Sequence, residues 1–159
     1  MDNTCGLKIG VDWLSLESGF AVFAGMIRVC LCRFWCCSGG AGMATVGEIC
    51  GVLREIAPLE LAESWDNVGL LLGDERAEVR RLMTCLTLTE DVAAEAAEGG
   101  VGLVVSHHPI FFRPVKRLTS GDAEGRTVLS LLRGGVAVYS AHTAFDSSSA
   151  GINQQLAVL

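Results

Sequence analysis

Short apolar runs alternate with amphipathic segments along most of this 159-residue chain, and the alternation limits the folds open to it. The run from Val101 to Val105 carries no polar side chain, as expected for a strand buried on both faces of a parallel sheet. Three further runs have strand length: Val68–Leu72, Leu82–Leu88 and Val136–Tyr139. Strands that alternate with helices are typical of βαβ units. The sequence therefore predicts an α/β fold with a mostly parallel sheet flanked by helices.

Helical signals occupy the segments between these runs. Thr45 and Glu48 form a capping-box pattern, in which each side chain satisfies a backbone N–H group at a helix start. Apolar residues then recur at helical spacing up to Pro58, which predicts a helix from Val46 to Ala57. Three more helices are predicted: Glu90–Glu98, Glu124–Arg133 and a last helix from Gly151.

All three histidines of the chain stand directly after predicted strands. His107 and His108 follow one strand, and His142 follows the next, with Asp146 four residues further on. In open α/β sheets, ligands bind beyond the carboxyl ends of the strands. A single helical crossover joins these two strands, so we expect the four side chains to converge on one crevice.

The four side chains favour a metal site over acid–base chemistry without a metal. Imidazole and carboxylate groups are ordinary ligands of zinc, iron, manganese and nickel. Two alternatives stay open. The histidines are hydrogen-bonded loop residues, or Asp146 is a helix N-cap, because Ser147–Ser149 and Gly151 resemble a turn.

The adjacent pair His107–His108 bears on the number of ions. Neighbouring residues of an extended strand point to opposite sides, so a turn or a second ion is needed for both to serve. A carboxylate is able to bridge two ions about 3.5–4 Å apart. Two ions usually need about six protein ligands, and Gly151–Leu159 adds no His, Asp, Glu or Cys. Either the site holds one ion, or its other ligands lie in sequence absent here; we expect the second, with the chain a fragment.

Trp65-Asp66-Asn67 precedes the strand predicted at Val68–Leu72. Asp66 and Asn67 are able to contact a ligand or orient the site, but both residue types also favour turns. Trp65 suits the core, or a lid over a pocket, better than a catalytic role. The tripeptide is therefore an open candidate.

The charge balance argues against a nucleic-acid partner. The chain has 12 Lys and Arg against 18 Asp and Glu, a net charge of −6. It therefore lacks the excess of clustered basic residues that is typical of nucleic-acid-binding proteins. It also has no Walker loop and no G-x-G-x-x-G pattern. Four basic residues follow the histidine pair: Arg113, Lys116, Arg117 and Arg126. They either hold a substrate phosphate near the metal or are solvated loop charges.

Residues 1–42 differ from the rest of the chain. They show no sustained helical or strand period, and their apolar stretch from Gly19 to Ile27 is too short to span a membrane. Acidic residues near the start argue against a secretory signal and a transit peptide. We leave residues 1–42 unassigned, as a disordered or untranslated extension, and expect translation to begin at Met43. The two cysteines after Met43 suit a reducing, cytoplasmic compartment.

Four motifs in this order resemble the Nif-three-like family, whose members are often named GTP cyclohydrolase 1 type 2 homologues. They are Leu61–Leu70 (LAESWDNVGL), Val105–Ile110 (VSHHPI), Phe112–Leu118 (FRPVKRL) and Tyr139–Asp146 (YSAHTAFD). The resemblance runs from about Val46 to Ala157. It makes residues 43–159 the N-terminal portion of a Nif-three-like α/β domain, with the C-terminal part missing.

The resemblance also implies a dinuclear centre with two divalent metal ions, and assembly into a ring-shaped homohexamer. His107, His108, His142 and Asp146 match metal ligands of the family. The family completes its site with a His and a Glu near its C-terminus, and this chain has neither. No membrane association is expected.

Two functions follow from the resemblance. The first is a metal-dependent hydrolase resembling GTP cyclohydrolase 1 type 2, in which metal-activated water attacks a nucleotide or phosphoester substrate. The alternative is a non-catalytic metal-binding adaptor or regulatory protein that forms a ring-shaped oligomer. Turnover in proportion to metal occupancy would separate the two.

Overall fold

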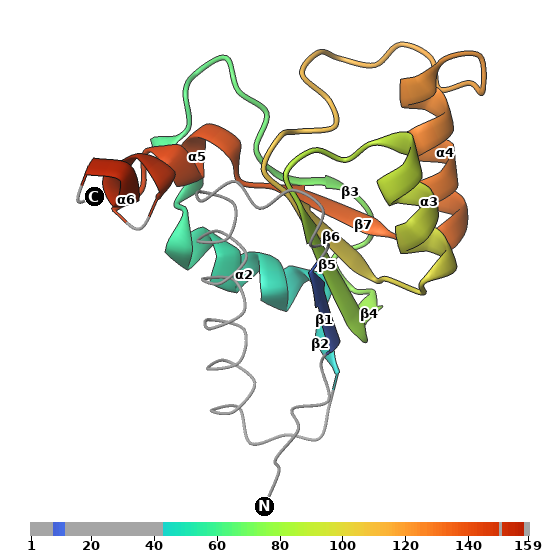
Figure 1. Ribbon diagram of the computed structural model, residues 1–159, viewed down its shortest axis with the longest axis horizontal. Helices are drawn as coiled ribbons and strands as arrows, with labels where there is room; N and C mark the ends of the chain where they lie inside the picture. The colour runs from blue at the N-terminus through green and yellow to red at the C-terminus, as the bar shows by residue number, and fades with distance from the viewer. Residues whose placement is uncertain (1–7, 12–42, 150, 158–159) are drawn as a thin grey trace, which may run out of the picture.

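The computed structural model describes residues 8–11, 43–149 and 151–157 (Figure 1). Most of residues 1–42, including the cysteine-rich stretch, therefore lies outside the described residues, and the assignment of this extension stays a prediction. Its four described residues, Lys8–Val11, form a strand, β1, that the sequence pattern does not predict.

A five-stranded sheet in the order β1-β5-β6-β7-β3 forms the centre of the molecule. Its further members are Gly69–Leu72 (β3), Arg81–Cys85 (β5), Leu103–Ser106 (β6) and Ala137–Ser140 (β7). The pairs β1–β5, β5–β6 and β6–β7 are parallel, whereas β3 runs antiparallel to β7. The prediction of a mostly parallel sheet is confirmed. The strand predicted to end at Leu88 ends at Cys85, because the chain bends at Leu86 and Thr87.

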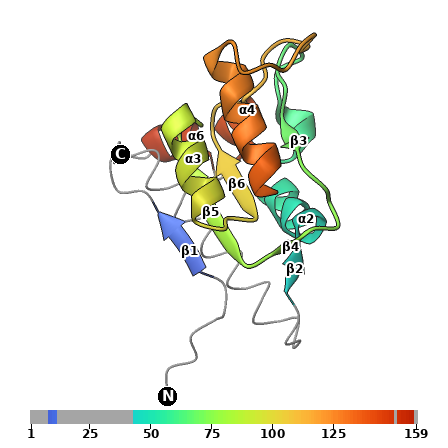
Figure 2. The ribbon, with the colours of Figure 1, turned by 90° about the vertical axis from the view of Figure 1, so that its right-hand side faces the viewer.

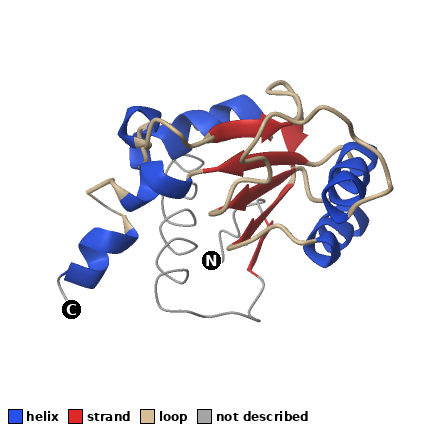
Figure 3. Ribbon diagram, turned by 90° about the horizontal axis from the view of Figure 1, so that it is seen from above, coloured by secondary structure: helices blue, strands red, loops and turns tan. Residues whose placement is uncertain are grey.

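Helices cover both faces of this sheet (Figures 2 and 3). Val46–Ile56 (α2) packs on one face, and Glu90–Glu98 (α3) and Ala123–Gly134 (α4) pack together on the other. Strand β6 contributes to both cores, since Leu103 and Val105 join the α2 core and Val104 joins the core of the opposite face. All four residues of β6 are buried, which explains its run of apolar residues.

The helix ends follow the predicted capping chemistry. At the start of α2, the backbone N–H of Glu48 donates to Thr45 Oγ1 at 3.3 Å, and that of Thr45 donates to the Glu48 carboxylate at 2.8 Å. The α3 N-cap is Thr89, whose side chain accepts from the Val92 N–H. The α4 N-cap is Asp122, which accepts a 2.7 Å bond from the Gly125 N–H. The predicted bounds of all three helices agree with the structure within one residue.

Smaller elements complete the described chain. Ala44–Thr45 (β2) pairs with Glu78–Val79 (β4) in a separate antiparallel sheet beside the start of α2. Two short helices follow β7: His142–Asp146 (α5) and Ile152–Ala157 (α6). The prediction of a last helix from Gly151 is confirmed by α6, whereas α5 is too short to show a helical period in sequence. Among the helices of the described ranges, none has the length and apolarity to cross a bilayer.

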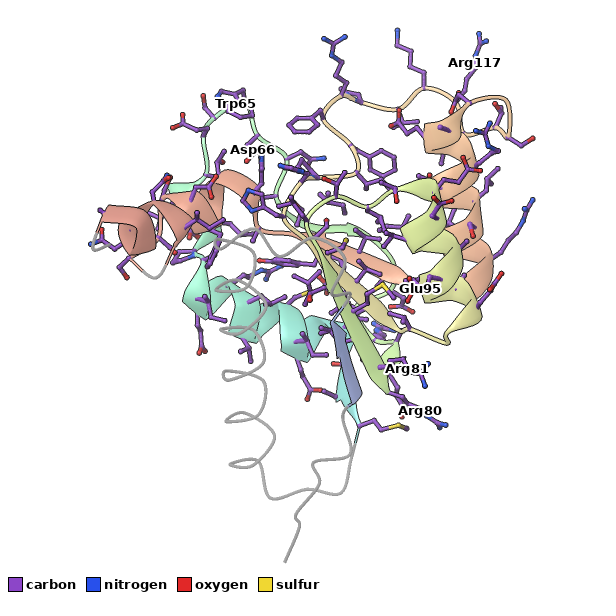
Figure 4. All side chains as sticks on the ribbon, in the orientation of Figure 1. Trp65, Asp66, Arg80, Arg81, Glu95 and Arg117 are labelled. Atoms are coloured by element: carbon purple, nitrogen blue, oxygen red, sulfur yellow. The ribbon has the colours of Figure 1, made fainter. Side chains whose placement is uncertain are left out.

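The direction of β3 decides what lies above the sheet. From α2 the chain passes through a 3-10 turn, Leu59–Leu61 (η2), and then runs down along β7, with Gly69 opposite Ser140. Residues that precede an antiparallel strand lie at the same sheet edge as residues that follow its parallel neighbours. Trp65 and Asp66 therefore lie above the carboxyl ends of the parallel strands (Figure 4).

Candidate metal centre

The chain bends immediately after β6, and the bend brings two histidine rings to the same side. The N–H groups of His107 and His108 donate to the carbonyl oxygens of Cys85 and Leu86, at 3.1 and 2.9 Å. The hydroxyl of Ser106 donates to the His108 carbonyl at 2.9 Å. The two ring centroids are 5.1 Å apart. A bend, one of the two arrangements that the adjacent histidines require, is therefore present.

The end of β7 turns directly into α5. His142, the first residue of α5, has a φ of +25°, and no other non-glycine residue in the described ranges has a positive φ. Its N–H donates to the His107 carbonyl at 3.2 Å, and the Ser140 hydroxyl donates to the same oxygen at 2.7 Å. The two strand ends are thus joined at one carbonyl.

Three of the four side chains predicted as ligands converge, and the fourth, Asp146, lies beside one of them. Ligand atoms of the three histidines all lie within 4.8 Å of one another. The ring centroid of His142 is 5.3 Å from that of His107 and 5.7 Å from that of His108. Asp146 is the last residue of α5, not an N-cap, and its Oδ2 is 3.7 Å from His107 Nε2. The expected approach of these side chains is present, and metal ligation by them stays a prediction.

Hydrogen bonds at Nδ1 orient two of the three rings. His108 Nδ1 is 2.7 Å from Thr87 Oγ1. His142 Nδ1 is 3.0 and 2.9 Å from the two carboxylate oxygens of Asp66. In both rings Nε2 is the nitrogen left for a ligand. Metal-binding histidines commonly have their other ring nitrogen held in this way.

Asp66 receives hydrogen bonds from three residues. Besides His142, the backbone N–H of Thr143 donates at 3.1 Å and that of Asn67 at 2.7 Å, and the Thr143 hydroxyl forms a further short contact. Burial on its own would raise the pKa of Asp66, but these bonds from Thr143, His142 and Asn67 outweigh it and lower the pKa. Asp66 is therefore an ionised, acceptor-only group beside His142.

The histidines after β6 favour their neutral forms. His107 is 7% exposed, and burial lowers its pKa although the Asp146 carboxylate acts in the opposite direction. Burial also lowers the pKa of His108, and the nearby His142 ring adds to this effect. Neutral imidazole is the form that binds metal ions, so the surroundings suit ligation.

Two exposed aromatic side chains flank His142. Trp65 is 61% exposed and Phe112 is 54% exposed, and both lie edge to face with the His142 ring, at centroid distances of 6.2 and 5.5 Å. Asn67 Nδ2 donates to the Phe111 carbonyl at 2.7 Å and joins the two loops that carry these aromatics. Trp65 is therefore a rim residue rather than part of the core, and Asn67 contacts a loop.

A pocket of about 480 Å³ lies beside this rim. It is lined by Phe112 and by three of the four basic residues considered for phosphate binding, Arg113, Lys116 and Arg117. The fourth, Arg126, does not line this pocket; its guanidinium donates to both carboxylate oxygens of Glu90, at 2.8 and 3.0 Å. The phosphate hypothesis is therefore limited to the three loop residues.

The donor set fits a divalent metal ion. Ligand nitrogens around one tetrahedral zinc lie about 3.4 Å apart, given Zn–N bonds of about 2.0–2.1 Å. Histidine ligand atoms within 4.8 Å of one another reach this spacing with small side-chain movements. The residues that sequence patterns overlooked are Thr87, Ser140 and Thr143, whose hydroxyls contact the histidines, their backbone or Asp66.

The fold and the strand-end histidine cluster together define an α/β protein with a candidate metal-binding site. A sequence model of the Duf34/NIF3 (NGG1p interacting factor 3) family matches residues 44–159, and the chain belongs to this family. The resemblance inferred from the four motifs is thereby confirmed.

Known relatives match the same part of the chain. The chain is 38% identical over 111 residues to a GTP cyclohydrolase 1 type 2 homolog of Clostridium perfringens, covering 70% of this chain and 42% of that protein. It is 39% identical over 124 residues to NIF3-like protein 1 of Rattus norvegicus, covering 77% of this chain and 33% of that protein.

A solved structure shows the same fold. The Bacillus cereus protein related to NIF3 superposes with a TM-score of 0.70 at 30% identity, covering 74% of this chain and 33% of that protein. The chain thus spans less than half the length of these relatives.

Proposed function

We propose that this chain forms part of a metal-dependent hydrolase with its metal at His107, His108, His142 and Asp146. The observation that carries the proposal is the convergence of three imidazole ligand atoms within 4.8 Å of one another, beside the Asp146 carboxylate. Two of the rings are already oriented through Nδ1, by Thr87 and by Asp66. Three imidazole nitrogens at one ion would leave a fourth position for the Asp146 carboxylate, and a fifth, at higher coordination number, for water or substrate.

A bound divalent ion would lower the pKa of a water ligand and polarise the bond under attack. The chain's own residues would bind and orient the substrate. Trp65 and Phe112, both exposed beside His142, offer aromatic rings against which a planar group can pack. Arg113, Lys116 and Arg117 offer donors to a phosphate group. This combination, and the printed name of the Clostridium perfringens relative, support a nucleotide or phosphoester substrate.

The proposal extends to two divalent ions and a ring-shaped homohexamer, as the family resemblance implies. The four candidate ligands suffice for one ion, and a second ion would need further donors, since each catalytic zinc takes about three protein ligands. Zinc, iron, manganese and nickel are all compatible with imidazole and carboxylate donors. A cytoplasmic location is part of the same proposal, supported by the buried positions of Cys50 and Cys85.

Metal loading followed by a substrate screen tests the proposal. The chain is loaded separately with zinc, iron(II), manganese and nickel, the bound ions are counted, and turnover of GTP and of phosphoesters is measured. We expect product formation in proportion to occupancy, and the loss of both metal and turnover in a variant combining His107→Ala and His142→Ala. Turnover that survives in this double variant would refute the metal-hydrolase assignment, and full occupancy without turnover would favour the non-catalytic adaptor.

The loop cations are tested by a matched pair of arginine variants. Arg117→Gln is expected to raise KM for phosphorylated substrates about tenfold, because a charged hydrogen bond contributes about 1.5–3 kcal/mol. Arg126→Gln is the control, since Arg126 is paired with Glu90 and does not line the pocket. Metal occupancy should be unchanged in both. Equal KM changes in the two variants would argue against phosphate binding by the loop.

A further inference from the structure

The Asp66 carboxylate has no exposed surface and faces the first turn of α5. It accepts from the His142 ring, from the next peptide N–H at Thr143, and from the Thr143 hydroxyl. Asp66 lies 76 residues before His142 in sequence, in the same loop as the exposed Trp65 (Figure 4). One side chain thus contacts both the ring and the following backbone of a candidate ligand.

We propose that Asp66 is a positioning residue that sets the tautomer and the backbone conformation of His142. Both oxygens of Asp66 already accept from backbone N–H groups, of Asn67 and of Thr143, so the carboxylate is the acceptor here and His142 Nδ1 carries the hydrogen in this contact. In the neutral ring this is the only N–H, so the Nε2 lone pair is free to bind a metal ion. This inference rests on the metal site proposed above and assigns a role to a residue outside its ligand set.

The contact made by His108 does not impose the same choice. The Thr87 hydroxyl is able both to donate and to accept, so the 2.7 Å contact with His108 Nδ1 is compatible with either tautomer. His108 also lacks the positive φ found at His142. Both rings need the Nδ1–H tautomer to bind a metal ion through Nε2, but only the carboxylate beside His142 imposes it, and only His142 has a positive φ to be held.

The backbone conformation of His142 is an independent reason to assign Asp66 this positioning role. A φ of +25° is unfavourable for a residue with a side chain, and such strain persists only where surrounding contacts hold it. The Thr143 N–H, which belongs to the peptide bond after His142, donates to Asp66 at 3.1 Å. The carboxylate therefore secures the peptide that follows the strained residue, in addition to the ring.

The tautomer is measurable in the full chain without metal. A long-range ¹H–¹⁵N correlation spectrum at neutral pH shows which ring nitrogen of each histidine carries the proton. We expect the Nδ1–H form at His142, and conversion of His142 to the Nε2–H form in Asp66→Asn, because an amide can present its NH₂ to Nδ1. A predominant Nε2–H form at His142 in the parent chain would overturn the proposal, and this measurement does not depend on any variant folding.

Zinc affinity provides the second readout, measured by competition with a chromophoric chelator. Loss of a group that orients a ligand typically weakens metal binding about 10- to 100-fold, and we expect a loss in this range for Asp66→Asn. Asn67→Ala is the matched control, because Asn67 lies in the same loop and contacts the Phe111 carbonyl instead of His142. Its zinc affinity should stay within about twofold of the parent. Equal losses in the two variants would reduce Asp66 to a loop-ordering residue and overturn the proposal.

The two readouts separate this inference from the proposed function. A parent chain that shows the Nδ1–H tautomer but binds no zinc would contradict the metal-hydrolase proposal and support the positioning of His142 by Asp66. If the parent chain binds zinc, and Asp66→Asn changes neither the zinc affinity nor the His142 tautomer, the positioning role of Asp66 is contradicted and the proposed metal site is supported.

Discussion

The ends of β6 and β7 hold their histidines by different means. After β6, the backbone keeps pairing with the segment beyond β5, through the N–H groups of His107 and His108. After β7, the chain turns at once into α5, and His142 depends on the Asp66 carboxylate from a distant loop. One end is therefore ordered largely by local backbone pairing, whereas the other is ordered by a side chain whose arrival requires the complete tertiary fold.

The largest difference between the two ends is expected when each histidine loses its partner. Asp66→Ala removes a buried carboxylate with several charged hydrogen bonds, and we expect the free energy of unfolding to fall by about 3 kcal/mol. Thr87→Val removes one neutral contact to His108 and should cost about 1 kcal/mol. Urea denaturation of the metal-free chain measures both. A larger loss in Thr87→Val would contradict the assignment of the stronger anchor to the β7 end.

A second, smaller difference concerns the backbone at the two ends. At His142 the positive φ favours glycine, so His142→Gly should be more stable than His142→Ala by about 1 kcal/mol. At His108 the order should reverse, because glycine loses more conformational entropy on folding and gains nothing there. Thermal unfolding of the four variants measures whether the glycine or the alanine variant is more stable at each position. A more stable alanine variant at both positions would show that His142 carries no backbone strain.

The smallest effect is expected at the start of α2, which provides a reference distant from both strand ends. Hydrogen bonds from the Thr45 backbone and hydroxyl lower the pKa of Glu48 below its ordinary value of 4.5. Its contribution to stability is therefore present above that value and is lost as the pH falls through the lowered pKa. Parent and Glu48→Gln should differ slightly in urea midpoint at pH 7 and converge near pH 3. A difference that is independent of pH would exclude an ionic contribution from this cap.

The convergence of the histidines could be predicted from sequence because it depends on a simple property of parallel sheets. Strands β6 and β7 are joined by one helix, α4, and pair in parallel, so the residues after them share an edge. The apolar run in β6 and the capping residues Thr45 and Thr89 are also local signals. These features of the sequence predict the main elements and place the histidines at one edge of the sheet.

The role of Asp66 could not be predicted in the same way. Its contact with His142 exists because β3 runs antiparallel to β7, and short apolar runs do not reveal strand direction. The residues Trp65-Asp66-Asn67 were therefore equally compatible with a turn. Pairing of Arg126 with Glu90, on neighbouring helices, is likewise a tertiary contact without a local signature. Helix α5, only five residues long, leaves no readable periodicity.

The His107 carbonyl, which links the ends of β6 and β7, affects how long the arrangement of the site persists. It accepts from both His142 and Ser140, and it stands at the ends of two fully buried strands. We expect the backbone hydrogen bonds in such positions to break only when most of the domain opens, whereas the side chains of Trp65 and Phe112 are already 61% and 54% exposed. The rim is therefore expected to rearrange many times while the arrangement of the histidine backbone persists until global unfolding.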